Sequence, residues 1–561
     1  ALNGFKYVLV TPGIEKVSQR FLKDLDYPKD KIAAFIPAPA YSAWWNMGNL
    51  EGEGGPISQS LIDSEAELGK AIVKRCKQLG MEPVLQGYVG FVPHDLPTAG
   101  VNGTILQQGK WCTYDRPAVL QPTSPAFANF AALWYKHVEK VYGIKAKAFG
   151  GDLFHEGGRK GNTDLGAAAK AVQTAMHKAS PKALWFIQAW GHNPDPKLLA
   201  GTDKDKTVVL FLNKDMTKTL NFNFQGRPHV WCELSNFGGN HGLYGGFSLL
   251  ENMQGDNGGY QGLGTLSEGV ETNPFYYALF TERINNREPI KRDAFIKRYS
   301  KSRYGSENAD IASYLNLLAE TVYKPDKIRE GCLENIMGAR PGLSVKKVST
   351  WSTETPYYDT GKVLEAGKHL LAAGKKEGEA LTSLETYRYD LADICRQVLA
   401  DRARTQLAEC KAAYDKKDEA AFKKASEGFI SLIDDAAAIL ATSKHFLLGV
   451  YLQGAKGRGK TPEDKALLER TLRRLITTWR QTGSSNLNGY AHREFSEIMT
   501  SYNKPRWKAY FDSCIDTMRD PNCKDHIGDF EEGRTGNNGQ IVEYRQERNS
   551  KVEKIEVDFP T

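Results

Sequence analysis

The stretch AFGGDLFHEGG, residues 148–158, begins as an apolar run and ends in a glycine-rich loop that carries His155 and Glu156. The run AKAFGGDLF (146–154) has the length and composition of a short strand buried on both faces. An acid that directly follows a strand lies where parallel α/β folds carry their chemistry. We therefore interpret Glu156 as a candidate catalytic acid, with a partner far away in the sequence.

Six further apolar runs of this kind precede residue 290. They are KYVLV (6–10), EPVLQGYVGFVP (82–93), ALWFIQAW (183–190), TVVLFL (207–212), HVWCEL (229–234) and YQGLGTLSEG (260–269). Helical patterns lie between them. One is predicted over Ser64–Leu79, where Ser64 and Glu67 form a capping box and Gly80 ends the helix. Strands that alternate with helices predict a parallel sheet with both faces covered.

Seven strands are one fewer than a closed (β/α)8 barrel contains. We expect a TIM-like barrel over residues 1–290, with its first strand before residue 1. The pattern then becomes helical, most clearly over Tyr387–Leu452, and predicts an all-helical domain over 291–525. The expected fold is thus α/β plus all-α. Residues 526–561 are polar and glycine-rich, which favours a polar C-terminal tail slightly over a short strand addition.

The composition excludes several kinds of partner. The 561 residues carry a net charge of +7 without a long basic block, so a nucleic-acid partner is not expected. No apolar window is long enough to predict a membrane span. The eight cysteines form no CxxC pair and no Cys/His cluster with zinc spacing, so we expect neither a metal nor a cofactor.

A second acid follows another predicted strand. Glu268 lies in GLGTLSEGVE (262–271), next to a glycine. A single loop glutamate is most often an ordinary solvated side chain. Two of them, Glu156 and Glu268, each after a strand and expected at one barrel opening, favour catalysis instead. Glycoside hydrolysis requires such a pair: one carboxyl protonates the leaving oxygen, and the other attacks the anomeric carbon or activates water.

Aromatic residues are frequent, at 11% with ten tryptophans. Several of the tryptophans lie in different predicted loops: Trp44, Trp111, Trp190 and Trp231. Core packing is the usual role of a tryptophan at a strand end, but rings gathered at one rim also suit sugar stacking. His155 is either a support for its strand end or a polar contact beside the acid. His241 is better explained as a structural residue that holds the glycine turn.

Several motifs together resemble glycoside hydrolase family 89, the α-N-acetylglucosaminidases. The motifs are YSAWWNMGNLEGEGGPISQS (41–60), GMEPVLQGYVGFVP (80–93), GGDLFHEGG (150–158), WCELSNFGGNHGLYGG (231–246), LSEGVETNPFYYALFTE (266–282) and LITTWRQTGSSNLNGYAHREFSEIMTSYNKPRWKAYF (475–511). The resemblance covers nearly the whole chain. It implies a small N-terminal domain, a (β/α)8 barrel and a helical domain, of which we expect the small domain and the first barrel strand to lie outside this sequence.

The resemblance also implies roles for particular residues. Glu156 corresponds to the acid/base and Glu268 to the nucleophile. The pocket is implied to be lined from the barrel by Trp44, Trp111, Trp190, Trp231, Phe237 and Asn240, and from the helical domain by Trp479, Leu487 and Tyr490. Some members have Asn in place of His155, and the loop before Tyr490 varies in length, which affects the placing of Leu487 most.

The implied activity is retaining exo-hydrolysis of terminal, non-reducing α-linked N-acetylglucosamine. The substrate would be a glycan, such as the end of a glycosaminoglycan or of a mucin-type chain, and the location secreted, periplasmic or lysosomal. Two alternatives remain open. One is a barrel glycosidase with a different sugar preference, because a fold and two acids define the reaction class better than the sugar. The other is a carbohydrate-binding protein that has lost catalysis.

Overall fold

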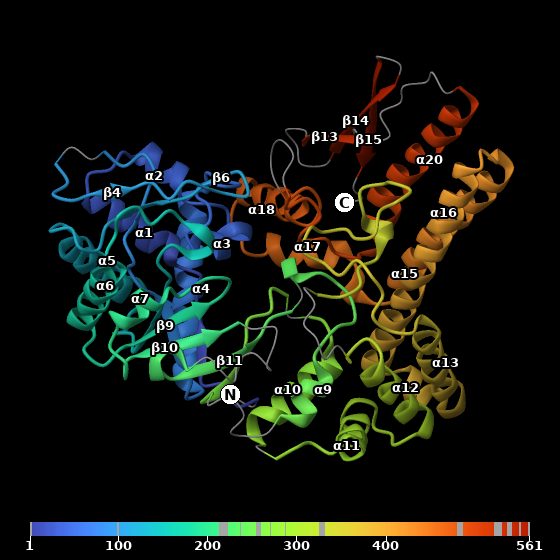
Figure 1. Cartoon of the computed structure of the whole chain (residues 1–561), viewed down its shortest axis with the longest axis horizontal. Coiled ribbons are helices and arrows are strands. Elements are labelled where there is room, and N and C mark those ends of the chain that lie inside the picture. Colours follow the sequence, from blue (N-terminus) through green and yellow to red (C-terminus); the bar gives the residue numbers. More distant parts are fainter. Residues whose placement is uncertain are drawn as a thin grey trace. The chain divides into compact units, whose positions relative to one another are not determined.

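The computed structural model describes most of the chain (Figure 1). The described residues are 3–97, 100–212, 223–235, 237–253, 260–269, 271–286, 288–324, 331–479 and 486–520, with the backbone of 530–535, 541–548 and 551–558. They form two compact units. The barrel unit comprises Ala1–Leu234, Asp256–Leu266 and Ala455–Thr471, and the helical unit comprises Ser235–Gly255, Ser267–Gly454 and Leu472–Thr561. The units interleave along the chain, so the division at residues 290 and 525 stays a prediction.

A seven-stranded parallel sheet forms the centre of the barrel unit. Its strands, in hydrogen-bonded order, are β1 (Tyr7–Leu9), β2 (Glu82–Gln86), β8 (Ala148–Gly150), β9 (Leu184–Ala189), β10 (Thr207–Phe211), β11 (His229–Glu233) and β12 (Gly262–Thr265). Each of the seven apolar runs contains one strand of this sheet, so this part of the prediction is confirmed. All neighbouring pairs are parallel, and the seven strands therefore end at one edge of the sheet.

The strands are buried on both faces, as continuous apolar runs predict. On β9, the consecutive residues Trp185, Phe186 and Ile187 are 0%, 6% and 2% exposed. Phe186 packs with Val84 and Ala148 of two other strands on one face of the sheet. Figure 1 shows β9, β10 and β11 as adjacent arrows. Such a sheet is a rigid base for the loops at its edge.

Helices of the barrel unit connect the strands. They are α1 (Ile14–Asp24), α2 (Lys29–Phe35), α3 (Ser42–Asn46), α4 (Gln59–Gln78), α5 (Phe127–Tyr142), α6 (Leu165–Ala179) and α7 (Pro196–Ala200). The predicted start of α4 at Ser64 is wrong. Ser58 is the N-cap, because its side-chain oxygen accepts a hydrogen bond from the N–H of Leu61 at 3.0 Å. Ser64 therefore lies inside the helix, although Gly80 follows its end as predicted.

Short strands form an insertion between β2 and α5. They are β3 (Phe91–Val92), β4 (Ile105–Leu106), β5 (Lys110–Trp111), β6 (Tyr114–Asp115) and β7 (Ala118–Leu120). β3, β7 and β4 pair as one small antiparallel sheet, and β5 pairs with β6 as another. This insertion was not predicted, because strands of two or three residues are too short to produce a periodic pattern.

The helical unit confirms the predicted change from alternating strands and helices to a mainly helical fold. Its helices are α9 (Phe247–Asn252), α10 (Pro274–Asn285), α11 (Arg292–Tyr304), α12 (Ala309–Glu320), α13 (Thr360–Glu377), α14 (Glu379–Thr382), α15 (Glu385–Asp415), α16 (Glu419–Leu440), α17 (Leu448–Lys456), α19 (Ser496–Ile498) and α20 (Lys504–Arg519), and α18 (Pro462–Leu475) begins in the barrel unit's last segment. Over the described residues, no helix combines the length and the apolar character needed to cross a bilayer.

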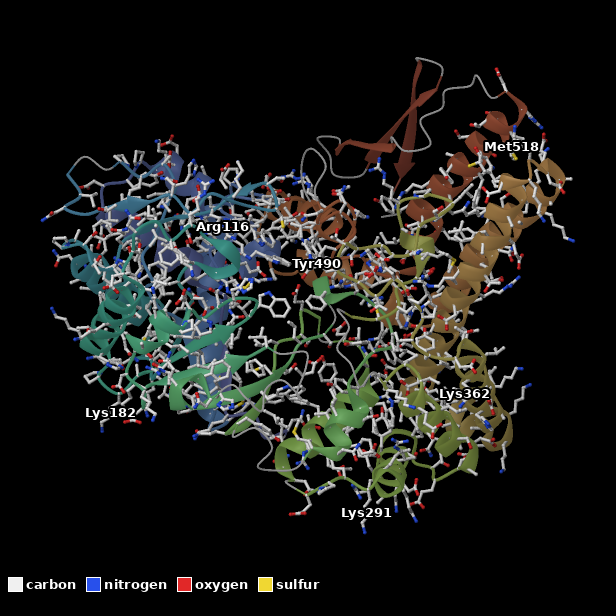
Figure 2. The ribbon with its side chains drawn as sticks, viewed as in Figure 1. Arg116, Lys182, Lys291, Lys362, Tyr490 and Met518 are labelled. Atoms are coloured by element: carbon white, nitrogen blue, oxygen red, sulfur yellow. The ribbon has the colours of Figure 1, made fainter. Side chains whose placement is uncertain are left out.

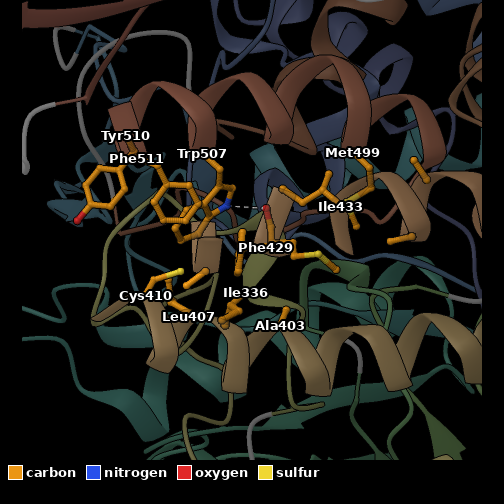
Figure 3. Close-up of a cluster of buried hydrophobic side chains, with 14 of the residues drawn as sticks. Ile336, Ala403, Leu407, Cys410, Phe429, Ile433, Met499, Trp507, Tyr510 and Phe511 are labelled. Atoms are coloured by element: carbon orange, nitrogen blue, oxygen red, sulfur yellow. Dashed lines mark hydrogen bonds between the residues drawn. The ribbon is translucent and has the colours of Figure 1, made fainter. Parts of the chain in front are cut away.

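A buried cluster joins α15, α16 and α20 (Figure 3). The rings of Phe429 and Trp507 lie 4.6 Å apart, and both side chains are fully buried. The indole N–H of Trp507 donates to the carbonyl oxygen of Met337 at 2.9 Å, so its buried polar atom is satisfied.

Exposed lysines such as Lys182 and Lys291 lie at the surface of their own units (Figure 2).

The C-terminal segment forms a three-stranded antiparallel sheet of β13 (Phe530–Thr535), β14 (Ile541–Arg548) and β15 (Lys551–Asp558). The strand addition, which the sequence analysis ranked second, therefore describes this segment better than a tail. Two segments, IVEYRQER (541–548) and KVEKIEVD (551–558), alternate apolar with polar residues over part of their length. That alternation is a strand signal, and the high content of charge and glycine obscured it.

Candidate active site

The loop that carries Glu156 begins where β8 ends and is attached to the neighbouring strand β9. Asp152 is 4% exposed, and its carboxylate accepts hydrogen bonds from the backbone N–H and the side-chain amide of Gln188, at 2.8 and 2.9 Å. Burial raises the pKa of Asp152, against the opposing effects of His155 and of these hydrogen bonds. The first turn of the loop is thus fixed to the sheet.

Glu156 has an unusual backbone conformation. Its φ is 44°, in the left-handed region that residues other than glycine rarely adopt. Two hydrogen bonds from Arg116 hold the backbone there: the guanidinium donates to the carbonyl oxygens of His155 and Glu156, at 2.9 and 2.6 Å. Strained backbone that the surroundings hold in place is concentrated at functional sites.

Two donors orient the half-buried carboxylate of Glu156. Asn49 Nδ2 donates to Oε2 at 2.8 Å, and the indole N–H of Trp190 donates to Oε1 at 3.0 Å. Trp190 directly follows β9, so the structure brings together two residues that the sequence analysis assigned to one site. Because each oxygen has its own donor, the rotation of the carboxylate is fixed.

Arg116 also determines how Asn49 is oriented. Its guanidinium donates to Asn49 Oδ1 at 3.3 Å and to the carbonyl oxygen of Gly48 at 3.2 Å. A guanidinium has no acceptor, so Asn49 must turn its oxygen toward Arg116 and its nitrogen toward Glu156. Burial lowers the pKa of Arg116, and the charge of Glu156 raises it. Sequence reasoning assigned no role to either residue, because an isolated Asn and an isolated Arg give no local signal.

The other predicted residues of the barrel unit occupy different positions. Trp44 lies on α3, and its carbonyl oxygen accepts the N–H of Asn49 at 2.9 Å. Trp111 ends β5, with its ring 6.3 Å from that of Tyr114. Trp231 on β11 and His155 are buried, and among the described residues neither the indole nitrogen of Trp231 nor Nδ1 of His155 has a hydrogen-bond partner.

Glu268 belongs to the helical unit, three residues after the end of β12. Its Oε2 accepts the backbone N–H of Gly238 at 2.9 Å, and the hydroxyl of Tyr490 lies 2.9 Å from both carboxylate oxygens. Tyr490 is 222 positions from Glu268 in the chain. Two donors therefore orient this carboxylate as well, and one of them comes from the C-terminal region that the family resemblance had assigned to the pocket.

Gly238 and Tyr490 meet so closely that only glycine fits. Gly238 has a φ of 65°, and a Cβ built there would lie 2.0 Å from the carbonyl oxygen of Tyr490. Arg493 donates to the carbonyl oxygen of Gly238 at 2.9 Å, and burial lowers the pKa of this guanidinium while Glu268 is among the groups that raise it. The ring of Trp351 packs edge-on against Tyr490, with the centroids 5.6 Å apart.

The remaining predicted residues of the helical unit are all buried. Phe237 is 7% exposed and lies next to Gly238. Leu487 is 1% exposed, and its carbonyl oxygen accepts the N–H of Tyr490 at 2.9 Å. Trp479 is fully buried and has a φ of 63°. Asn240 is 3% exposed, and its side-chain amide donates to Glu334 at 2.8 Å.

No group of three His, Cys, Asp or Glu side chains that could hold a metal ion occurs in the described part of the chain. Glu156 and Glu268 are two oriented carboxylates, the kind of group that general acid–base and nucleophilic catalysis use. A parallel strand-helix sheet with an acid after each of two strands is the arrangement typical of barrel glycoside hydrolases.

The chain matches two family descriptions: residues 1–287 match the "Alpha-N-acetylglucosaminidase (NAGLU) tim-barrel domain", and residues 295–547 match the corresponding C-terminal domain. The human protein named alpha-N-acetylglucosaminidase is 28% identical over 546 residues, with 92% of this chain and 71% of the human protein covered. The chain therefore belongs to the α-N-acetylglucosaminidase family, glycoside hydrolase family 89.

Solved structures of the family 89 glycoside hydrolase from Clostridium perfringens have the same fold. They have a TM-score of 0.86 and 30% identity, with 92% of this chain and 60% of that chain covered. One is a variant with two glutamate-to-glutamine substitutions, in complex with its substrate GlcNAc-α-1,4-galactose. Another is a complex with 2-acetamido-1,2-dideoxynojirimycin. The chain thus spans about three fifths of the bacterial enzyme's length.

Proposed function

We propose that the chain hydrolyses terminal, non-reducing α-linked N-acetylglucosamine from glycans, with retention of configuration. Glu156 is the acid/base and Glu268 the nucleophile. One observation carries the proposal: each glutamate follows a strand of the same parallel sheet, and each carboxylate is oriented by two donors from other parts of its unit. The family membership supports N-acetylglucosamine as the sugar that is released, since the structure of the bacterial relative was solved in complex with its substrate GlcNAc-α-1,4-galactose.

The two acids follow two different strands of one sheet. β8 and β12 are strands of one parallel sheet, and their ends lie at one edge. Glu268 follows the last residue of β12 by three positions, a length of chain that spans at most about 10 Å. A retaining mechanism requires the two carboxyl groups to be about 5 to 5.5 Å apart when sugar is bound.

The stereochemistry of the substrate explains why a protein nucleophile is needed. In an α-linked N-acetylglucosamine, the 2-acetamido group lies on the same side of the ring as the leaving group and cannot displace it from the rear. Glu268 attacks the anomeric carbon from the opposite face and forms a covalent glycosyl-enzyme intermediate, while Glu156 protonates the leaving oxygen. Glu156 then removes a proton from the water that releases the sugar, and the configuration is retained.

The donors around the two acids fit these roles. Gly238 N–H and Tyr490 hydroxyl both donate to Glu268, which fixes the orientation of the carboxylate that attacks the anomeric carbon. Asn49 and Trp190 fix the plane of the Glu156 carboxyl and so direct its proton toward one leaving oxygen. Orientation of reacting groups before the reaction is a large part of an enzyme's advantage over solution.

The test is hydrolysis of aryl α-N-acetylglucosaminides by the wild-type chain and by Glu156→Ala and Glu268→Ala. Glu268→Ala should lose turnover with every leaving group but keep sugar binding. Glu156→Ala should lose most activity on a poor leaving group and less on a good one, because a good leaving group does not need the proton. Glu67→Ala on α4, whose side chain is 73% exposed, is the matched control and should act as wild type.

The same assay distinguishes the alternatives. A preference for an aryl α-glucoside or an aryl β-N-acetylglucosaminide over the α-N-acetylglucosaminide would assign a different sugar. If the wild-type chain binds the sugar but releases no product, the chain is a carbohydrate-binding protein that has lost catalysis. Normal turnover by Glu268→Ala, or a β-configured first product in an NMR time course, would refute the mechanism.

A further inference from the structure

Glu334 is a fully buried carboxylate to which sequence reasoning gave no role. It is 0% exposed and lies between α12 and α13 in the helical unit. Its Oε2 accepts the backbone N–H groups of Val348 and Ser349, at 2.7 and 2.9 Å, and also the hydroxyl of Ser352. Its Oε1 accepts the hydroxyl of Ser349 and the amide of Asn240, both at 2.8 Å. A buried carboxylate with five donors is a hub that fixes the segments supplying them.

The first segment is the loop that supplies one donor to Glu268. Asn240 is 3% exposed and lies two residues after Gly238, whose N–H donates to Glu268. The backbone N–H of Asn240 donates to the carbonyl oxygen of Phe237 at 3.3 Å, which closes the turn around Gly238. Since the amide of Asn240 is bound to Glu334, the hub fixes the end of this turn.

The second segment is connected to the other donor of Glu268. Residues 348–352 donate four of the five hydrogen bonds to Glu334, and they also contact the chain around Tyr490. Trp351 in this segment packs edge-on against the Tyr490 ring, and Thr350 donates to the carbonyl oxygen of Asn486 at 2.6 Å. His492, two residues after Tyr490 in the sequence, also lies near the hub: its Nδ1 is 3.8 Å from Glu334 Oε1.

We propose that Glu334 is a positioning residue for Glu268, because it holds the turn whose N–H donates to that carboxylate and the segment that packs against Tyr490. The inference rests on the proposed function, in which Glu268 is the nucleophile. Glu334 acts through Asn240 on the Gly238 N–H, and through residues 348–352 on the Tyr490 hydroxyl.

Glu334→Gln is the most informative variant. The backbone N–H groups of Val348 and Ser349 require an acceptor, so the new amide oxygen takes the place of Oε2 and the amide nitrogen takes that of Oε1. That nitrogen then faces Asn240 Nδ2, so two donors oppose each other until the Asn240 amide turns over and gives up the orientation that the carboxylate fixed. The turn around Gly238 loses its anchor. We expect kcat/KM to fall by about 10- to 100-fold, the range that follows when a buried hydrogen-bonding group is left without its partner.

A swap of the two side chains should restore the contact. In Glu334→Gln with Asn240→Asp, the amide of the new glutamine donates to the new aspartate, and the charge of the pair is unchanged. Most of the lost kcat/KM should return, whereas Asn240→Asp alone places two carboxylates together and should be as impaired as Glu334→Gln. Glu320→Gln and Asn285→Asp, the same changes at exposed positions of the helical unit, are the controls.

A double-mutant cycle with Tyr490→Phe distinguishes positioning from general support of the fold. If Glu334 acts through the donors of Glu268, removing the Tyr490 hydroxyl should cost less in Glu334→Gln than in the wild type. The acidic limb of the pH profile of kcat/KM should also move to higher pH in Glu334→Gln, because the ionised nucleophile has lost donors. Ser352→Ala, which removes one donor to the hub, should produce the same pH shift to a smaller extent if Glu334→Gln fails to fold.

The outcomes separate this inference from the function on which it depends. Additive effects of Glu334→Gln and Tyr490→Phe, an unmoved acidic limb, or no recovery in the swapped pair would overturn the positioning role while the activity of the wild type stands. A wild-type chain that does not hydrolyse the aryl α-N-acetylglucosaminide would end both proposals. Thermal unfolding of each variant confirms that the comparison is made on folded protein.

Discussion

Asn49 and Glu156 lie 107 positions apart in the chain, yet the amide nitrogen of one donates to the carboxylate of the other at 2.8 Å. Arg116 makes this contact unambiguous, because it donates to the oxygen of Asn49 and leaves only the nitrogen to face Glu156. The same guanidinium holds the carbonyl oxygens of His155 and Glu156. One buried cation thus controls both the backbone and, through Asn49, the side chain of the candidate acid.

Arg116→Lys should therefore impair proton transfer to the leaving group. A lysine ammonium cannot reproduce the planar fork that contacts four acceptors at once. We expect kcat/KM to fall by about 10- to 100-fold, since small misplacements of a catalytic group have effects of this size. The loss should be larger for a poor aryl leaving group than for a good one. Arg75→Lys on the exposed side of α4 is the control, and an equal loss on all leaving groups would count against the assignment.

The sequence predicted the elements that depend on local patterns. All seven strands of the parallel sheet were found from short apolar runs, because burial on both faces requires such runs. The predicted start of α4 was wrong, because both Ser58 and Ser64 can cap a helix and local sequence does not distinguish them. Glu156 and Glu268 were predicted to be catalytic because each follows a strand.

Apart from Trp190, the residues that orient those two acids could not be predicted from local sequence. Tyr490 lies 222 positions from Glu268, and only the family resemblance pointed to it. Arg116 and Glu334 gave no signal at all, because their importance comes from acceptors and donors that the fold gathers around them. A buried charge is costly unless it is paired, but the sequence does not reveal which charges are buried.

Gly238→Ala should disrupt the arrangement around Glu268. The new Cβ would lie 2.0 Å from the carbonyl oxygen of Tyr490, and backbone cannot move aside as a flexible side chain can. Gly305→Ala is the matched control, because Gly305 has a similar φ of 68° and open space around it. Both variants carry the conformational cost of about 1 kcal/mol for a left-handed alanine, but only Gly238→Ala should also lose activity. Kinetics and thermal unfolding of the pair isolate the clash.

His241 should make the stability of the helical unit depend on pH. It is buried, and burial, followed by the charges of Arg493 and Arg396, lowers its pKa well below the usual value. Its Nδ1 accepts the backbone N–H of Glu494 at 3.1 Å, a bond that only the neutral ring can accept. As pH falls below about 6.5, the unfolded chain binds a proton that the folded chain does not, so this residue's contribution to stability is lost on acidification.

His241→Asn tests this dependence. The asparagine oxygen can accept the same N–H but cannot be protonated. The decline in the free energy of unfolding between pH 7 and pH 5 should become shallower by up to about 1.4 kcal/mol per pH unit. Urea unfolding at the two pH values measures the difference. His192→Asn, at an exposed position, should leave the decline unchanged, and an equal effect of the two substitutions would contradict the prediction.

Glu15 should make the stability of the barrel unit depend on pH in the opposite direction from His241. Burial, with the nearby charge of Glu65, raises its pKa to about 7, while hydrogen bonds from Ser42 and Gly13 lower it. The folded chain keeps a proton that the unfolded chain has already released, so stability is greatest below about pH 4.5 and falls as pH rises through 7. The shift from 4.5 to about 7 corresponds to a loss on the order of 3 kcal/mol.

Glu15→Gln should remove this loss, because glutamine is a neutral isostere of the protonated acid at every pH. The free energy of unfolding at pH 8 should rise relative to the wild type, and the difference between the two chains should shrink as the pH is lowered toward 5. Glu67→Gln, on the exposed face of α4, changes the same charge without the burial and should show no such pH-dependent gain. A constant difference between Glu15→Gln and the wild type from pH 5 to 8 would mean that Glu15 stays ionised in the folded chain.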